Sequence, residues 1–223
     1  EHGYYVVPTD AAAGRLALLG VSRGRIRTIG IPVDLSGAGG EPGARAPSAA
    51  RRVLILGGSF GLNLSRETVQ ALDISPEPFD IHVVCGLNGP LRRTLAAARG
   101  AFRHAVSVWG YVGDVPQRMR QADLIVTKPG GMTTAEALAL RTPLVLLPPL
   151  PGQEQYNRDF LTRSGAAAPT TVESLESTVT MLLRTPAALD AMRGRAAALG
   201  RPDAARDIAG YILLDLLAAG QAR

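Results

Sequence analysis

Several residue types are scarce in this sequence, and each absence narrows the class of protein. The 223 residues include one cysteine, Cys85, so no internal disulfide can form, which is typical of a reducing compartment. No run of about 18 apolar residues occurs, so no membrane-spanning helix is expected. Aromatic residues make up only 4% of the chain, and no basic stripe is interleaved with them. This pattern argues against nucleic acid as a partner.

Several catalytic motifs are also missing. No cysteine and histidine cluster suggests zinc, no Gly-x-Ser-x-Gly motif suggests a hydrolase, and no Asp-x-Asp motif suggests a carboxylate-bound metal. The glycine-rich stretch 57–61 is not Gly-x-Gly-x-x-Gly, and it lacks the Gly-Lys-Ser/Thr ending of a Walker loop. We therefore expect neither a metal nor a cofactor, and no hydrolysis of nucleoside triphosphates.

The chain is basic, and its positive charge is carried almost wholly by arginine. The formal net charge is +5, and Lys128 is the only lysine among the 24 Lys and Arg residues. A coding bias toward arginine on a solvated surface explains this composition. The alternative is attraction to anionic lipid headgroups or phosphates, and composition alone leaves it open.

A regular alternation of apolar strands and helices begins at residue 51. Hydrophobic residues make up 46% of the chain, enough for a sizeable core. Strands that alternate with helices at this spacing form a parallel sheet with helices on both faces. We therefore predict an α/β fold with a Rossmann-like sheet. The predicted strands are 53–56, 81–85, 105–108, 124–126 and 144–147, and the later helices are 153–163, 172–183, 187–199 and 204–217.

The two ends of the chain do not fit this alternation. Two strands, 3–8 and 25–33, and a helix at 9–20 cannot bury themselves alone, so they are expected to be part of another domain. The stretch 34–50 is rich in Gly, Pro, Ala and Ser, which is typical of a linker. The predicted segments are 1–33 as a remnant of an N-terminal domain, 34–50 as a linker, 51–200 as the α/β domain, and 201–223 as a C-terminal helix.

The predicted C-terminal helix has an apolar face that requires a partner. Ile208, Ile212 and Leu216 lie four residues apart and share that face. We expect the helix to pack against residues 1–33 or against another chain.

The stretch from residue 124 to residue 131 predicts a ligand-binding turn. Residues 124–126 form a short apolar strand of the kind found inside parallel sheets. Pro129 favours an extended conformation at Lys128, which ends the strand and presents this side chain. Gly130 and Gly131 then allow a tight turn and close approach of a ligand to the backbone.

The residues that follow this turn predict an anion site. Thr133 is expected to cap a helix, whose free N–H groups and dipole attract phosphate. Glu136 in the first turn is then close enough to bind hydroxyl groups of the same ligand. Alternatively, Thr133-x-x-Glu136 is a capping box, in which Glu136 satisfies only the helix's own N–H group.

Two further glycine-bearing loops are expected at the same edge of the sheet. Residues 57–61, Gly-Gly-Ser-Phe-Gly, follow a strand and are predicted to open a helix, which is the setting of a phosphate cradle. Gly152 leads into a helix on which Gln153 and Asn157 share one face, beside Glu154. Such groups suit sugar hydroxyls, which need both donors and acceptors. A plain tight turn and a polar helix start are the alternatives.

Four motifs together resemble one lineage of GT-B glycosyltransferases. Their order and spacing are similar to those of the monogalactosyldiacylglycerol synthases and the processive diacylglycerol glucosyltransferases, with MurG as a more distant relative. The resemblance implies that this chain holds the donor-binding half of a two-domain enzyme. The motifs are Gly57–Gly61, Gly110-Tyr111-Val112, Thr127-Lys128-Pro129-Gly130-Gly131-x-Thr133-x-x-Glu136-Ala137 and Pro151-Gly152-Gln153-Glu154-x-x-Asn157.

The resemblance also implies a role for each motif. Val112 lies against the uracil and Glu136 holds the ribose hydroxyls, while Ser59, Gly131 and Thr133 face the diphosphate. The implied UDP-binding residues are Gly58, Ser59, Phe60, Tyr111, Val112, Lys128, Gly130, Gly131, Thr133 and Glu136. The implied sugar-binding residues are Pro151, Gly152, Gln153, Glu154 and Asn157.

The activity implied by the resemblance is transfer of a hexose from a UDP-sugar to a lipid acceptor such as diacylglycerol, with inversion and without a metal. The acceptor site and the general base belong to a first domain, so no catalytic base is named and the chain alone is expected to be inactive. We expect a cytoplasmic protein, peripheral on the inner face of an anionic membrane. The alternatives are a soluble nucleotide-sugar-binding subunit of a split transferase and a UDP-sugar epimerase.

Overall fold

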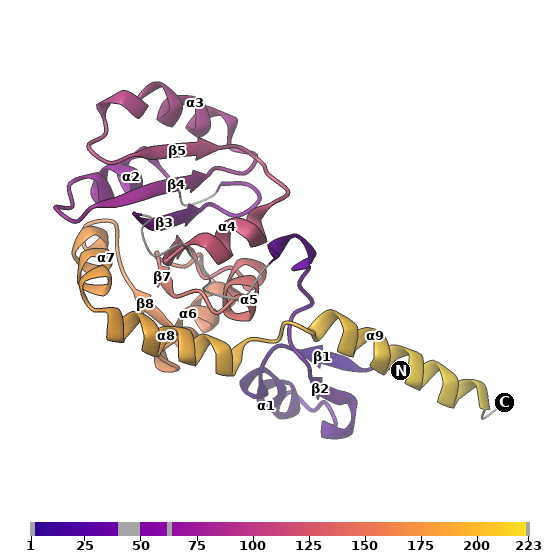
Figure 1. Cartoon of the computed structure of the whole chain (residues 1–223). Helices are drawn as coiled ribbons and strands as arrows, with labels where there is room; N and C mark the ends of the chain where they lie inside the picture. Colours follow the sequence, from indigo (N-terminus) through magenta and orange to yellow (C-terminus); the bar gives the residue numbers. More distant parts are fainter. Residues whose placement is uncertain (1–2, 40–49, 62–63, 222–223) are drawn as a thin grey trace. The chain divides into compact units, whose positions relative to one another are not determined.

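The strands of this chain form two separate parallel sheets (Figure 1). The computed structural model describes residues 3–39, 50–61 and 64–221, with side chains described as far as Leu214. The predicted linker therefore lies largely outside the described residues. By their contacts the residues form two compact units, Glu1–Leu35 with Arg201–Arg223, and Ser36–Gly200.

The larger unit is built on a six-stranded, all-parallel sheet. Its strand order is β5-β4-β3-β6-β7-β8, and Val53 of β3 pairs with Ile81 of β4 on one side and Leu124 of β6 on the other. This is the doubly wound order, in which the chain reverses direction across the sheet between its first and fourth strands. The strands are β3 (Arg51–Leu56), β4 (Phe79–Val84), β5 (Val106–Trp109), β6 (Leu124–Thr127), β7 (Leu144–Leu146) and β8 (Ala167–Pro169).

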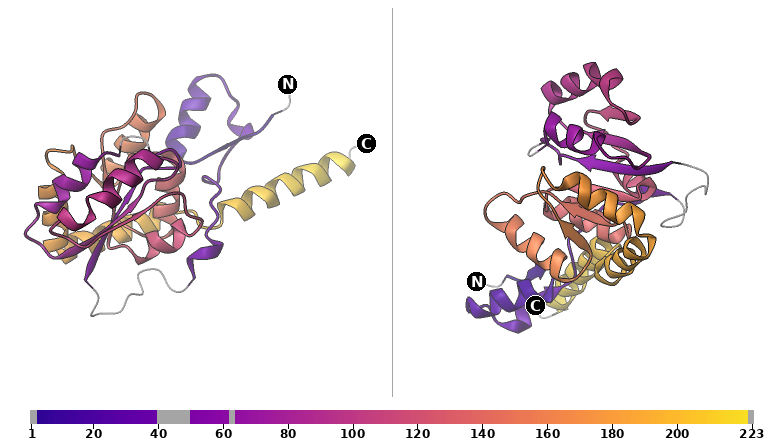
Figure 2. Two further views of the ribbon diagram at one scale, coloured as in Figure 1. Left: turned by 90° about the horizontal axis from the view of Figure 1, so that it is seen from above. Right: turned by 90° about the vertical axis from the view of Figure 1, so that its left-hand side faces the viewer.

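Helices cover both faces of this sheet, as Figure 2 shows. Helix α2 packs against α3 and α7, α4 packs against α5, and α8 packs against α5 and α7. The predicted Rossmann-like α/β fold is confirmed. The helices are α2 (Arg66–Asp73), α3 (Gly89–Ala97), α4 (Val115–Gln121), α5 (Gly131–Ala139), α6 (Gln153–Arg163), α7 (Leu175–Arg184) and α8 (Pro186–Leu199), with short 3-10 turns at Ser36–Ala38 and Arg99–Ala101.

The central strands are buried on both faces, which explains why their sequences are continuously apolar. The segments 53–55 of β3 and 124–126 of β6 are fully buried. Cys85 is buried just after the end of β4, and burial raises the pKa of its thiol to about 11. The thiol is therefore protonated and unreactive at neutral pH.

Several elements differ from the prediction. Strand β8 was missed because its three residues, two alanines and a proline, carry no hydrophobic pattern. Strand β2 covers only Ile26–Thr28, because the N–H groups of Ile29 and Gly30 both turn back to the carbonyl oxygen of Val7. Helix α2 begins at Arg66 rather than in the preceding glycine loop, because Ser65 caps it by accepting from the Thr68 N–H group.

The smaller unit joins the two ends of the chain. Strands β1 (Tyr5–Val7) and β2 are parallel and are connected by α1 (Asp10–Leu18) and a 3-10 turn at Arg23–Arg25. In the C-terminal helix α9 (Ala204–Gln221), Tyr211 makes an edge-on ring contact with Tyr4 and lies under the Arg27 guanidinium. Helix α9 therefore packs on the N-terminal segment. None of the helices in the described residues combines the length and hydropathy needed to cross a membrane.

Candidate functional site

The loops predicted to bind a ligand meet at the carboxyl edge of the six-stranded sheet. Strands β3 and β6 are neighbours at the point where the strand order reverses, and open α/β sheets bind ligands in the crevice at that point. The two strand ends are linked directly, since the Thr127 hydroxyl donates to the Leu56 carbonyl oxygen at 3.0 Å. The loops beginning at Gly57 and Lys128 therefore leave the sheet side by side.

Lys128 forms an ion pair with Glu154 across this edge. Its Nζ atom donates to Glu154 Oε1, while Glu154 Oε2 accepts from the Leu150 backbone N–H group at 2.9 Å. Both side chains are largely shielded from solvent, with exposed fractions of 18% and 14%. The lysine side chain also passes close to Gly58. The only lysine of the chain is thus held between the loop after β3 and helix α6.

Helix α6 is anchored to the loop after β6 by its first turns. The Asn157 side chain donates to the Pro129 carbonyl oxygen at 2.9 Å. Gly152 has a φ of 102°, a left-handed conformation that favours glycine, and it leads the chain into the helix at Gln153. Gln153 is exposed, as is Pro151 before it. Of the implied sugar-binding residues, Glu154 and Asn157 therefore face the loop after β6.

Helix α5 begins earlier than predicted, so Thr133 does not cap it. Gly130 is the N-cap, without a side-chain cap hydrogen bond, and Gly131 is already the first helical residue. The Gly130 N–H group donates to the Lys128 carbonyl oxygen at 2.8 Å, so the free N–H groups of the helix start belong to Gly131 and the residues just after it. The predicted cap at Thr133 was wrong, and the capping-box alternative is excluded with it.

Glu136 is accordingly available to a ligand. Its side chain is half-buried in the second turn of α5 and forms no hydrogen bond within the described part of the chain. Burial raises the pKa of this carboxyl group above its usual range. A carboxylate in such a position gains from any hydroxyl group that hydrogen-bonds to it.

The glycine loop after β3 is clamped to the loop after β4. The Leu87 backbone N–H group donates to the Ser59 carbonyl oxygen at 2.8 Å, and the Asn88 side chain donates to the Gly61 carbonyl oxygen at 3.3 Å. At Gly86, whose φ is 58°, a Cβ atom would lie 2.4 Å from the Ser59 oxygen. The loop conformation therefore depends on glycine, and it leaves the side chains of Ser59 and Phe60 exposed.

The loop after β5 is braced by Arg118 of α4. The Arg118 guanidinium lies 4.1 Å from the centre of the Trp109 ring and donates to both carboxylate oxygens of Asp114, at 2.8 and 2.9 Å. These hydrogen bonds lower the pKa of Asp114. Tyr111, which is exposed, and Val112, which is half-buried, lie between Trp109 and Asp114. Both ends of the short loop that carries them are therefore fixed.

Most of this chain matches a known protein family. The sequence profile of the glycosyltransferase family 28 C-terminal domain matches residues 52–208, more than half of the chain. The chain belongs to this family. The resemblance to glycosyltransferases that the motifs indicated is thereby confirmed for the C-terminal part.

The most similar curated relatives share one name. The processive diacylglycerol beta-glucosyltransferase of Bacillus pumilus (strain SAFR-032) is 32% identical over 197 residues, which cover 85% of this chain and 51% of the relative. The protein of that name from Bacillus subtilis (strain 168) is 31% identical over 170 residues, covering 73% of this chain and 44% of the relative. This family 28 chain thus spans about half the length of the curated relatives it matches.

Solved structures with the same fold include glycosyltransferases and an epimerase. Acinetobacter baumannii MurG superposes with a TM-score of 0.65 at 23% identity, covering 75% of this chain and 51% of MurG. A protein described as a UDP-N-acetylglucosamine 2-epimerase from Listeria monocytogenes gives 0.69 at 19% identity, covering 94% and 58%. Anabaena HepE in complex with UDP-glucose gives 0.61 at 15% identity, covering 94% and 63%. At these identities the similarity establishes the shared GT-B-type fold.

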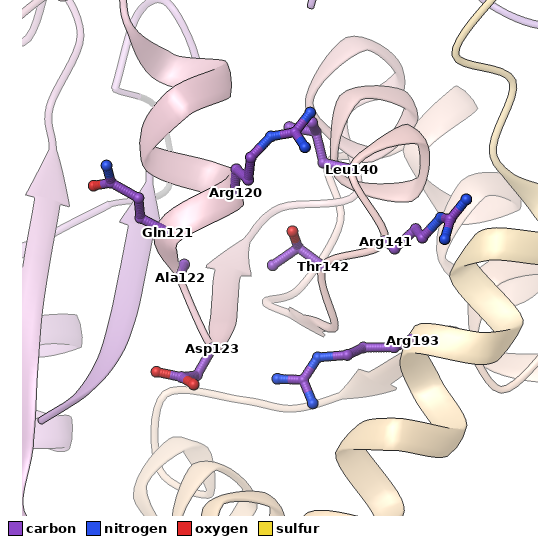
Figure 3. Close-up of a pocket in the computed structure, with 8 residues that line it drawn as sticks. All are labelled: Arg120, Gln121, Ala122, Asp123, Leu140, Arg141, Thr142 and Arg193. Atoms are coloured by element: carbon purple, nitrogen blue, oxygen red, sulfur yellow. The ribbon is translucent and has the colours of Figure 1, made fainter. Parts of the chain in front are cut away.

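A small pocket of the family 28 chain lies at the opposite, amino edge of the sheet (Figure 3). It is lined by the ends of α4 and α5, the starts of β6 and β7, and Arg193 of α8. Arg120 lies in the last turn of α4 and Arg141 follows the end of α5, and cations near a helix C-terminus offset the negative end of the helix dipole. The arginines are thus explained by helix stability, and the loops named above are not part of this pocket.

Sequence reasoning missed several residues that shape this family 28 site. Arg118 and Asp114 have the i, i+4 spacing of an ion pair, and Asn88 precedes Gly-Pro as a helix cap, so both signals were present. The pairing of Lys128 with Glu154 had no sequence signal, because 26 residues separate them. Among the described residues, no three His, Cys, Asp or Glu side chains come together in a way that could hold a metal ion.

Proposed function

We propose that this chain is the donor-binding part of an inverting, metal-independent glycosyltransferase. The full enzyme moves a hexose from a UDP-sugar to a lipid acceptor, diacylglycerol. The observation that carries this proposal is the convergence of the Gly57 and Lys128 loops and helix α6 at the β3–β6 switch point, in a chain of the glycosyltransferase family 28. The names of the curated relatives support diacylglycerol as the lipid that accepts the sugar.

The diphosphate of the donor binds between the glycine loop and the start of α5. The free N–H groups at Gly131 and Thr133, and the positive end of the helix dipole, favour an anion there. Lys128 supplies the nearby positive charge, and the loop of Gly58, Ser59 and Phe60 closes the other side. These groups stabilise the negative charge that develops on UDP as the bond to the sugar breaks.

The nucleoside lies beside the diphosphate. Glu136 accepts hydrogen bonds from the ribose hydroxyls, which offset the cost of its burial. The loop of Tyr111 and Val112 packs on the uracil, with Arg118 bracing the loop from behind. In this proposal no metal ion is required at the diphosphate, because Lys128 and the start of α5 neutralise its negative charge.

The hexose lies toward α6. Pro151, Gly152, Gln153, Glu154 and Asn157 surround it, and their amide and carboxylate groups satisfy hydroxyl donors and acceptors. Glu154 is occupied by Lys128 and the Leu150 N–H group in this structure, so a bound sugar shares this carboxylate with the lysine. The sugar identity depends on which hydroxyl Glu154 and Gln153 accept.

The acceptor and the general base are provided by an N-terminal acceptor domain outside this chain. The chain alone therefore binds donor without transferring sugar. Residues 1–33 with helix α9 are the part through which that domain connects to the donor domain. The enzyme acts on the cytoplasmic side, at the inner face of the membrane, since its acceptor is a lipid.

Two other functions fit parts of the same site. A split transferase, in which this chain is a soluble donor-binding subunit, predicts co-purification with a membrane-bound acceptor subunit. An epimerase is suggested by the structural similarity to the Listeria protein, and it predicts consumption of UDP-N-acetylglucosamine without any acceptor. The family and the curated relatives favour the transferase.

Calorimetric titration of UDP into the wild-type chain and Glu136→Ala tests the proposed site. Loss of a charge-assisted hydrogen bond to ribose costs about 1.5–3 kcal/mol, so affinity falls roughly ten- to a hundredfold. Glu77→Ala, which removes a carboxylate paired with Arg184, is the matched control and should bind UDP normally. Absence of UDP binding by the wild-type chain would contradict the proposal, and equal binding by Glu136→Ala would remove Glu136 from the site.

A further inference from the structure

Lys128 is the single lysine in a chain that otherwise uses arginine for positive charge. It is one of 24 Lys and Arg residues, and it lies at a position that is largely shielded from solvent. A planar guanidinium binds a carboxylate with two parallel hydrogen bonds, whereas an ammonium is a compact charge on a flexible stem. An ammonium therefore changes partner more readily than a guanidinium does. A lysine at this one position suits a cation that exchanges partners.

The ion pair of Lys128 with Glu154 lies directly against the start of α5. A Cβ atom added at Gly130, the N-cap, would lie 3.7 Å from Lys128 Nζ and 3.9 Å from Glu154 Oε1. An anion bound at the free N–H groups that follow Gly130 is therefore near both members of the pair. The carboxylate attracts the lysine and repels the anion, so it opposes the binding of a diphosphate alone.

The two carboxylate oxygens of Glu154 have different partners. Oε1 accepts from Lys128, whereas Oε2 accepts from the Leu150 backbone N–H group at 2.9 Å. The bond to Leu150 keeps the side chain in place when the lysine leaves. Oε1 is then a shielded acceptor without a donor, which is unfavourable unless another N–H or O–H group replaces the ammonium. A sugar hydroxyl group is a donor of this kind.

We propose that Lys128 and Glu154 form an exchangeable ion pair through which the donor site favours a UDP-sugar over UDP. The inference rests on the proposed function, because it needs the diphosphate at the start of α5 and the hexose at α6. When a UDP-sugar binds, the diphosphate takes Lys128 and a sugar hydroxyl donates to Oε1, so both members of the pair keep a partner. UDP alone either takes the lysine without replacing it or binds without the lysine. In both cases UDP binds more weakly, which assists its release after transfer.

Calorimetric titration of UDP and of UDP-glucose into the wild-type chain and Glu154→Gln tests this preference. The glutamine oxygen can still accept from Leu150, while its NH₂ group faces the ammonium and releases Lys128. We expect Glu154→Gln to bind UDP about three- to tenfold more tightly. UDP-glucose should bind no more tightly than to wild type, because loss of the charged acceptor for a sugar hydroxyl offsets the release of the lysine.

Two further variants give the control and a second test. Glu77→Gln removes the same charge from a carboxylate paired with Arg184, and it should leave both affinities unchanged. Lys128→Arg should bind UDP about five- to twentyfold more weakly, because the guanidinium stays on Glu154, and adding Glu154→Gln should restore part of this loss. An equal change for UDP and UDP-glucose in Glu154→Gln, including no change, would overturn the proposal and leave the pair a purely structural role.

The response of Lys128 itself separates this inference from the proposed function. Lysine labelled with ¹³C at Cε gives one side-chain signal from this chain, and both UDP and inorganic diphosphate can be titrated against it. If UDP binds to the wild-type chain but neither ligand shifts the signal, the exchange fails and the donor site stands. If diphosphate shifts the signal and binds more tightly to Glu154→Gln while UDP does not bind, the exchange stands and the donor-site proposal fails. If neither ligand binds, both fail.

Discussion

Glu136 illustrates a conflict between stability and binding at a single residue. Its half-buried carboxyl group has a raised pKa because burial penalises the charged form. A group whose pKa is raised in the folded state contributes most stability at low pH, and this contribution is lost as pH rises through the folded-state pKa. At neutral pH the ionised carboxylate therefore destabilises the free chain, which is the expected cost of a group kept for a ligand.

The variant Glu136→Gln should separate the two effects. At pH 7 we expect a higher melting temperature than wild type, because the amide removes a buried charge. The difference should shrink as pH falls through the raised folded-state pKa and disappear below the usual glutamate pKa of 4.5, where the wild-type group is protonated in both states. Thermal denaturation across pH measures this. A lower melting temperature for the variant at pH 7 would show that the carboxylate stabilises the fold.

Asp73 shows the opposite arrangement at the amino edge. Burial raises the pKa of Asp73, but hydrogen bonds from the backbone N–H groups of His104 and Arg103 outweigh it and lower the pKa. The carboxylate accepts these bonds at 2.8–3.0 Å, and His104 also places its ring on Phe79. These contacts give His104 a structural role.

Replacing Asp73 should destabilise the larger unit. Asp73→Asn leaves one oxygen and introduces an NH₂ group beside two N–H donors, so we expect a loss of about 2–4 kcal/mol in unfolding free energy. Since the folded-state pKa is lowered, the stability from Asp73 is present above pH 3.8 and is lost as pH falls through the folded-state pKa. The penalty of the variant should therefore shrink in acid. Denaturant unfolding with a pH-independent penalty would contradict this explanation.

At the scale of elements, the loops after β3 and β4 act as one piece. A Cβ atom at Gly86 would lie 2.4 Å from the Ser59 oxygen and 2.5 Å from the Gly58 oxygen. These are backbone atoms, so Gly86→Ala must displace the glycine loop and also strain a left-handed φ. We expect a loss of more than about 2 kcal/mol and weaker UDP binding.

A second glycine provides the control for this prediction. Gly194 lies within α8, and an added Cβ there would have open space within 4 Å. Gly194→Ala should therefore stabilise the chain by about 0.5–1 kcal/mol. Urea unfolding and UDP titration of both variants measure the contrast. Wild-type UDP affinity in a folded Gly86→Ala variant would show that the loop does not contact the ligand.

The Arg118 brace predicts selective loss of base recognition. In Arg118→Met, the loop of Tyr111 and Val112 loses its anchor on Trp109 and Asp114, so affinity for UDP should fall about five- to twentyfold. Binding of inorganic diphosphate should stay within about twofold of wild type, because that group binds at other loops. Arg118→Lys keeps the charge but not the two parallel hydrogen bonds, and it should be intermediate. Equal losses for both ligands would indicate general unfolding.

The elements differ in how well the sequence predicted them. Helix α6 begins and ends where predicted, because Gly152 marks its start clearly. The start of helix α5 was predicted too late in the sequence, because Thr133 before an apolar run suggested an N-cap. In the structure Gly130 is the N-cap and Gly131 is the first helical residue. Strand β8 had no pattern, and only its pairing with β7 defines it.

At the scale of the whole molecule, the edge of the sheet was predictable but the contacts across it were not. Parallel strands end at one edge, so loops after buried strands were expected to meet there. The order that places β3 beside β6 comes from packing and handedness over the full sheet, and no local pattern specifies it. The pairing of Lys128 with Glu154 and the bracing by Arg118 follow from that order.

The most direct test of the central claim is to map UDP binding on the amide nuclear magnetic resonance spectrum of the wild-type chain. The claim is that the donor binds at the carboxyl edge, at the β3–β6 switch point. Chemical shift changes should concentrate in the loops at 57–61, 110–113 and 128–136 and at the start of α6, with the amino edge unaffected. Changes centred instead on the pocket of Arg120, Arg141 and Arg193 would contradict it.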